Sequence, residues 1–122
     1  WTVLYDPARI TVKAAAEFAK ENLNVAARFA EYATPGEVKS TDDIAPGTGA
    51  VVRRGFRKIA AYRDESGMLH CRSAVCTHLR CIVHWNSDER TWDCPCHGSR
   101  FDDKGEVLDG PATKPLAPVS AP

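Results

Sequence analysis

The spacing of apolar residues changes near residue 36. Between Thr11 and Tyr32 apolar residues recur at helical spacing, and neither Pro nor Gly interrupts them, which predicts one amphipathic helix. A broad apolar face results, made of Val12, Ala16, Ala19, Leu23, Ala26 and Ala30 with Phe18, Val25, Phe29 and Tyr32 beside them. Such a face packs against another surface. That surface is either the helix's own domain or a neighbouring domain absent from this sequence, and the pattern leaves both readings open.

After residue 36 the pattern changes to short strand-like runs separated by turns, and no second helix is predicted. Gly55 and the polar stretch 64–67 supply turn chemistry. The three runs that they separate predict a small antiparallel meander, with strands at 50–54, 58–62 and 68–71. The predicted fold class is therefore mainly β, preceded by one N-terminal α-helix.

Two further runs, 82–85 and 90–93, flank the polar stretch Asn86-Ser87-Asp88-Glu89. This arrangement predicts a β-hairpin. The hairpin places the segment that ends at Cys81 beside the segment that starts at Cys94. Two groups of metal-type residues should therefore meet at its open end.

Length and charge restrict the function. A chain of 122 residues suits one compact domain, and 16 acidic residues balance 16 basic ones. We therefore expect no nucleic-acid partner. Apolar stretches fall far short of the roughly 18 residues of a membrane span. The sequence starts at Trp1 without a secretory pattern, so we expect a cytoplasmic piece of a longer chain.

Four of the five cysteines and two histidines lie in two short stretches, 76–81 (CTHLRC) and 94–99 (CPCHGS). This interleaving is more typical of a metal site than of a disulfide framework. One thiolate and one imidazole from each stretch suit a two-iron, two-sulfur cluster, with the thiolates on one iron and the imidazoles on the other. One structural zinc ion is the alternative, although it explains the second cysteine pair poorly.

These stretches resemble the two boxes of the Rieske family, C-x-H-x-x-C and C-x-C-H-G-S, and both boxes match in full. The resemblance runs from about Val38 to the C-terminus, and Gly110-Pro111-Ala112 is similar to the proline loop that covers the cluster in this family. It implies a Rieske-type antiparallel β-sandwich with a cluster-binding hairpin subdomain. We expect this domain at residues 37–122, after a helical connector at 1–36.

The resemblance also implies the roles of six residues. Cys76 and Cys94 would ligate the inner iron of a Rieske 2Fe-2S cluster, and His78 and His97 the outer, more exposed iron. The remaining pair, Cys81 and Cys96, would form a disulfide between the two stretches, a feature of the high-potential branch of the family.

Four more residues are expected around the cluster. Gly98 would let backbone amides approach the sulfur atoms, and Pro111 belongs to the covering loop. The Ser99 hydroxyl would donate a hydrogen bond that raises the potential. Respiratory members of the family commonly have Tyr at the position of Phe101, and Phe cannot donate that hydrogen bond. We therefore expect a potential lower than theirs.

The whole chain, including residues 1–7 and 19–24 and the segment 81–86 between the boxes, resembles the C-terminal Rieske domain of bacterial FAD-dependent oxidoreductases of the amine or amino-acid oxidase type. This implies one-electron transfer with FAD in a missing upstream domain of the same chain, and an electron donor or acceptor that is a protein or a small molecule. A soluble domain of a cytochrome-complex Rieske subunit that oxidises quinol is the alternative. No complete enzyme active site is expected in this piece.

The other conspicuous residues are given structural roles. Cys71 lies in a strand-like run and is expected to be buried and inert. No ligand spacing surrounds the other two histidines, His70 and His84. Trp85 and Trp92 should pack across the hairpin. The basic residues at 53–54 and 57–58 predict a solvated face.

Overall fold

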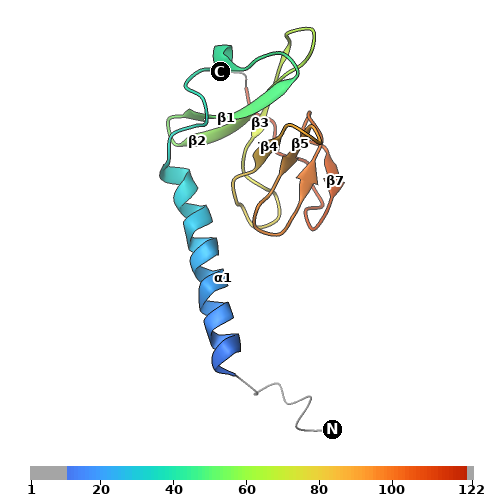
Figure 1. Ribbon diagram of the computed structural model, residues 1–122. Coiled ribbons are helices and arrows are strands. Elements are labelled where there is room, and N and C mark those ends of the chain that lie inside the picture. Colours follow the sequence, from blue (N-terminus) through green and yellow to red (C-terminus); the bar gives the residue numbers. More distant parts are fainter. Residues whose placement is uncertain (1–10, 121–122) are drawn as a thin grey trace.

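A computed structural model describes residues 11–120, which form one helix and two small antiparallel sheets (Figure 1). The helix α1 spans Val12–Ala30, and a short 3-10 helix, η1, follows at Glu31–Ala33. The predicted mainly β fold with one N-terminal helix is confirmed. Residues 1–7, on which part of the wider resemblance depends, lie outside the described residues.

The start of α1 follows from its sequence. The Thr11 side chain accepts a hydrogen bond from the backbone N–H of Ala14 at 3.1 Å, which satisfies one of the unpaired donors of the first turn. No residue of α1 is buried, and Phe18 and Leu23 are 72% and 71% exposed. Figure 1 shows the helix extending well beyond the sheets. The described part of the chain therefore leaves most of the apolar face uncovered, and none of its helices has the length and apolar character of a membrane span.

The first sheet is the predicted meander. It contains β1 (Thr48–Arg54), β2 (Arg57–Arg63) and β3 (Leu69–Ser73) in that order, and both pairs are antiparallel. Gly55 and Gly67 have positive φ angles of 60° and 87°, which Gly adopts without steric cost. The turns therefore lie where the sequence predicts them. A short 3-10 helix, η2 (Thr41–Asp43), precedes the sheet.

The second sheet carries the predicted hairpin. Its strands are β4 (His84–Asn86), β5 (Thr91–Asp93), β6 (Arg100–Phe101) and β7 (Val107–Asp109), in that order. The β4–β5 pair is the hairpin, with Trp85 opposite Trp92 and their ring centroids 5.1 Å apart. The packing of the two tryptophans across the hairpin is confirmed. Strands β6 and β7 extend the sheet beyond what the pattern predicts.

The main core joins both sheets. Val51, Ala60 and Tyr62 from the first sheet pack in one cluster with Trp92 and Phe101 from the second. Phe101 is fully buried. The buried residues Cys76, Cys81 and Cys94 belong to the same cluster. The loops that carry the candidate ligands are therefore built on the core of the domain.

The prediction of a solvated basic face is wrong for Lys58, whereas Arg53, Arg54 and Arg57 are exposed. Lys58 is only 5% exposed, and its ammonium donates to the Thr34 hydroxyl at 3.2 Å and to the Pro35 carbonyl at 2.8 Å. The Arg53 guanidinium donates to the carbonyls of Ala33 at 3.0 Å and Thr34 at 3.3 Å. Because cations favour the free carbonyls at a helix C-terminus, these two side chains attach the end of the helical segment to the first sheet.

Candidate metal centre

The candidate ligands lie in two loops with the same backbone hydrogen bonds. In the first loop, residues 76–81, the Cys76 N–H donates to the Cys81 carbonyl at 2.8 Å and the Arg80 N–H to the Cys76 carbonyl at 3.0 Å. In the second loop, residues 94–99, the Cys94 N–H donates to the Ser99 carbonyl at 2.8 Å and the Gly98 N–H to the Cys94 carbonyl at 3.1 Å. The two loops are therefore local copies of one another, although their sequences share only the first cysteine.

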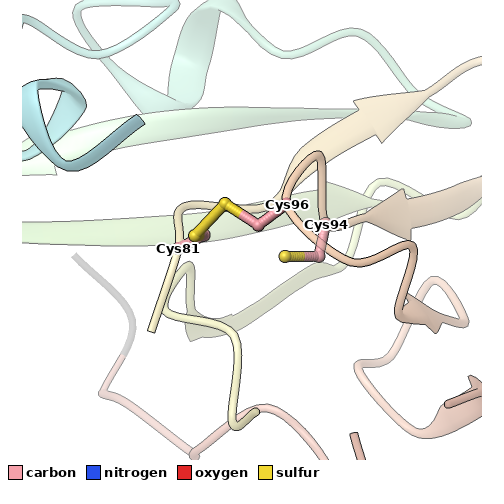
Figure 2. Close-up of side chains that lie close together, drawn as sticks. All are labelled: Cys81, Cys94 and Cys96. Atoms are coloured by element: carbon pink, nitrogen blue, oxygen red, sulfur yellow. A yellow bond between two sulfur atoms is a disulfide. The ribbon is translucent and has the colours of Figure 1, made fainter. Parts of the chain in front are cut away.

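A disulfide joins the two loops. Cys81 and Cys96 are bonded, and their Cα atoms lie 6.5 Å apart (Figure 2). The first loop precedes β4 and the second follows β5, so the hairpin brings the two cysteines together as predicted. A covalent link suits this place because short loops have few apolar contacts of their own. The disulfide expected from the resemblance is confirmed.

The two remaining loop cysteines are free thiols on the inner side of the loops. Cys76 is 1% exposed and Cys94 5% exposed. Burial raises the pKa of the Cys94 thiol, while N–H groups of Cys96 and His97 donate to its sulfur and oppose the rise. The Cys76 thiol is hydrogen-bonded to Cys94 and raises the pKa further. Two neighbouring buried sulfur atoms suit a cation that takes up both as thiolates.

The two loop histidines lie on the outer side. Both His78 and His97 are exposed, and their ring centroids are 5.1 Å apart with the ring planes nearly perpendicular. The loops therefore present one buried pair of sulfur ligands and one exposed pair of nitrogen ligands.

This donor set fits a Rieske 2Fe-2S cluster. A Rieske centre needs two thiolates on one iron and two imidazoles on the other, and the chain supplies one pair inside and one pair outside. The sulfur atoms of Cys81, Cys94 and Cys96 also lie within 4.8 Å of one another, and Figure 2 shows Cys94 beside the disulfide. These three are not a ligand set, because two of them are bonded to each other and cannot become thiolates while the disulfide persists.

The proline loop is tied to both ligand loops. The Ser99 side chain is fully buried, and its oxygen accepts a hydrogen bond from the Ala112 N–H at 3.0 Å. The Thr77 hydroxyl donates to the Lys114 carbonyl at 2.6 Å. Pro111 directly precedes Ala112, the first of these two attachment points. Because the Ser99 oxygen only accepts in the bond to Ala112, its hydroxyl proton stays available for the predicted bond to the cluster.

Gly98 has a conformational reason to be glycine. Its φ is 78°, and a Cβ atom added there would meet no protein atom within 4 Å. The left-handed backbone, and not contact with other protein atoms, is therefore what favours glycine at this position. The predicted approach of backbone amides to the cluster stays a prediction. The first loop has Arg80 at the matching position, with a φ of 64°, which costs a non-glycine residue about 1 kcal/mol or more.

Sequence reasoning missed the contacts that join the segment after the helix to the first ligand loop and to β4. The Tyr32 hydroxyl donates a hydrogen bond to the Arg80 carbonyl. The His84 imidazole contacts Glu31 at 2.7 Å through Nε2 and Glu37 at 2.8 Å through Nδ1. His84 is thus structural, as predicted, and so is His70, which contacts Asp64 at 2.9 Å. No spacing in the sequence signals the Tyr32 and His84 contacts, because each joins segments that lie 47 or more residues apart.

Comparisons with known proteins agree with this geometry. The profile of the Rieske [2Fe-2S] domain matches residues 34–120. The Rieske 2Fe-2S iron-sulfur protein YhfW of Bacillus subtilis (strain 168) is 48% identical over 97 residues, which are 76% of this chain and 19% of that protein. The cytochrome b6-f complex iron-sulfur subunit of Chlorobaculum tepidum is 34% identical over 87 residues, 66% of this chain and 48% of that subunit.

Among solved structures, the cyanobacterial plasma membrane Rieske protein PetC3 from Synechocystis PCC 6803 superposes with a TM-score of 0.58 at 27% identity. The match covers 71% of this chain and 88% of that protein. In contrast, the match spans less than half of the length of either curated relative. Because the family profile covers most of the chain and includes both ligand loops, the chain belongs to the Rieske [2Fe-2S] domain family.

Proposed function

We propose that this domain exchanges single electrons with FAD held by an oxidoreductase domain of the same polypeptide, and that four loop residues ligate its cluster. The proposed ligands are Cys76 and Cys94 for the inner iron and His78 and His97 for the outer iron. Rieske-type electron transfer is the activity of the family to which the chain belongs. The identity of the four ligands and the flavin partner are the parts of this proposal that go beyond membership of the family.

The burial pattern of the two loops carries the ligand assignment. Two buried thiols face inward and two exposed imidazoles lie side by side at the surface. When bound, the cluster supplies a one-electron couple within the Rieske range of about −150 to +300 mV. His78 and His97 lie at the molecular surface, whereas Cys76 and Cys94 on the inner side are only 1% and 5% exposed.

Two observations support an additional domain as the partner. The match to YhfW covers 19% of that protein, so this relative carries a long further stretch of chain. The α1 helix keeps an apolar face exposed, as expected of a connector that packs against a neighbour. The resemblance to flavin-dependent oxidoreductases names FAD as the cofactor of that neighbour. The proposal includes a cytoplasmic location, which cell fractionation tests.

The second candidate is a Rieske subunit of a cytochrome complex that accepts electrons from quinol. The 34% identity to the cytochrome b6-f complex subunit of Chlorobaculum tepidum favours it. The two candidates differ in the direct redox partner, because one predicts a flavin in the same polypeptide and the other a membrane quinol.

The ligand assignment is tested on the purified chain. Visible and low-temperature EPR spectra are recorded before and after dithionite, and iron and zinc are quantified. We expect a coloured protein whose reduced form gives the EPR signal of mixed Cys and His ligation. His97→Ala should lose this signal, and His70→Ala should keep it because His70 lies away from the loops. A normal Rieske spectrum from His97→Ala, or a colourless protein that holds one zinc ion, overturns the assignment.

The flavin proposal is tested on the full-length natural polypeptide. We expect it to purify with one FAD for each 2Fe-2S cluster, and anaerobic reduction of the flavin should be followed by reduction of the cluster. A polypeptide without flavin that is reduced by quinol in a complex with a cytochrome supports the second candidate and overturns the first.

A further inference from the structure

The first ligand loop has an unfavourable backbone at Arg80. This residue has a left-handed φ of 64°, in a loop whose counterpart places Gly98 at the same step. A side chain makes this conformation costly, so it persists only where neighbouring contacts fix it. One such contact is inside the loop, where the Arg80 N–H donates to the Cys76 carbonyl at 3.0 Å.

The other contact comes from outside the domain's sheets. The hydroxyl of Tyr32, in η1, donates to the Arg80 carbonyl. The Tyr32 ring is half-buried and packs against the core cluster that includes Cys76 and Cys81. The backbone N–H and the backbone carbonyl of Arg80 are therefore both hydrogen-bonded. The N–H donates to Cys76 within the loop, and the carbonyl accepts from the Tyr32 hydroxyl.

Tyr32 is itself held in place by its neighbours. Glu31 contacts the His84 ring at 2.7 Å, which ties η1 to the start of β4. The residues just after Tyr32 accept hydrogen bonds from Arg53 and Lys58 of the first sheet. The segment from 31 to 35 is thus attached to both sheets, and it carries the Tyr32 hydroxyl to a fixed place beside the loop.

We propose that Tyr32 is a positioning residue for the first ligand loop. By fixing the Arg80 peptide it sets the path of the chain between His78 and the disulfide cysteine Cys81. Because Tyr32 lies in η1, which follows α1 directly, the same contact relates the position of that helix to the position of the exposed ligand His78. The second loop is held differently, through Ser99 and the Ala112 N–H at 3.0 Å.

The test compares two tyrosines in the cluster-loaded domain. Tyr32→Phe keeps the ring and removes the hydroxyl. Tyr62→Phe is the matched control, because its hydroxyl accepts from Arg90 at 2.7 Å, in a half-buried bond that involves neither ligand loop. Hydrogen exchange by mass spectrometry is measured on peptides from 76–81 and 94–99, and EPR g values are measured on the reduced cluster.

Tyr32→Phe should speed exchange in 76–81 by roughly two- to tenfold, the effect of one lost hydrogen bond, and leave 94–99 unchanged. It should also shift the g values, because His78 lies in the loosened loop. Tyr62→Phe should change neither. Unchanged exchange in 76–81, equal acceleration in both loops, unchanged g values, or a Tyr32→Phe chain that does not fold would each overturn the proposal.

This inference rests on the proposed ligand set, and different measurements contradict the ligand set and the positioning role. The wild-type EPR spectrum tests whether the cluster has mixed Cys and His ligation. The comparison of Tyr32→Phe with wild type tests whether the hydroxyl positions the loop. A wild-type Rieske signal with no effect of Tyr32→Phe overturns the positioning role alone.

Discussion

Arg80 and Gly98 occupy matching positions in the two ligand loops. Each has a positive φ, 64° and 78°, and each donates its N–H to the carbonyl of the cysteine that begins its loop. The two halves of the site therefore share one backbone design, although only one half uses glycine for it. The effect of this difference on the stability of the domain can be measured.

Gly98→Ala should destabilise the oxidised domain by about 1 kcal/mol, because a Cβ at positive φ is strained. No steric term adds to this cost, since the new Cβ would meet no protein atom within 4 Å. Thermal unfolding should show a melting temperature lower by about 4 °C. Arg80→Gly is the comparison, and it should lie within about 0.5 kcal/mol of wild type, because relief of strain offsets the added entropy of the unfolded chain. A neutral Gly98→Ala would contradict the conformational explanation.

Local signals in the sequence predicted a large part of this structure. The helix lies within two residues of its predicted bounds, because helical periodicity is a property of consecutive residues. The hairpin follows from one polar turn between two apolar runs, and it accounts for the meeting of Cys81 with Cys96. The buried thiols and exposed histidines were implied by the resemblance of the two boxes to the Rieske family.

Contacts between distant segments could not be predicted in this way. Tyr32 and Arg80 are separated by 48 residues, and no spacing relates them. The role of Lys58 as a partner of the Pro35 carbonyl likewise depends on how the sheet lies against the end of the helical segment. Strand β6 has only two residues, which is too short to show a period of alternation.

The disulfide should contribute strongly to stability. Cys81 and Cys96 are separated by 15 residues, and closing such a loop is worth about 3 kcal/mol in the chain-entropy model. The double variant Cys81→Ser, Cys96→Ser should lose about that amount and release iron faster to a chelator. Chemical denaturation followed by circular dichroism measures the loss.

Cys71→Ser is the control for the disulfide variant, because Cys71 is a free, half-buried cysteine outside the loops. It should leave the rate of iron release unchanged. If the double variant unfolds at the same denaturant concentration as Cys71→Ser, the disulfide does not stabilise the fold, and its role is confined to the cluster.

The His84 contacts should make stability depend on pH. Hydrogen bonding to Glu37 raises the pKa of His84, and the Glu31 contacts add to the rise, while burial opposes it. A raised folded-state pKa gives stability that is complete below the unfolded pKa of about 6.5 and is lost as pH rises through the folded value. The side chain is 40% exposed, so screening limits the effect to about 1 kcal/mol.

His84→Gln tests this dependence. The difference in melting temperature between wild type and the variant should be largest near pH 6 and shrink toward pH 9. The pKa of the Glu37 carboxyl lies below its usual range, so this carboxylate stays charged and the change reports on the imidazole. A difference that is constant or that grows with pH would mean that His84 acts through packing alone.

Phe101→Tyr should raise the reduction potential. Phe101 is fully buried in β6, opposite Trp92, and respiratory members of the family commonly place Tyr at this position, where its hydroxyl donates to a ligating cysteine sulfur. A donor near the sulfur favours the reduced, more negative cluster. If the bond is about 1 kcal/mol stronger in the reduced state, the potential rises by roughly 40 mV for one electron. Phe56→Tyr is the control, because Phe56 is 94% exposed and should leave the potential unchanged. The reduction potentials of the wild type and the two variants are measured by direct voltammetry. A lower or unchanged potential for Phe101→Tyr would show that a hydroxyl at 101 does not reach a ligand. It would also contradict the expectation that Phe lowers the potential of this domain.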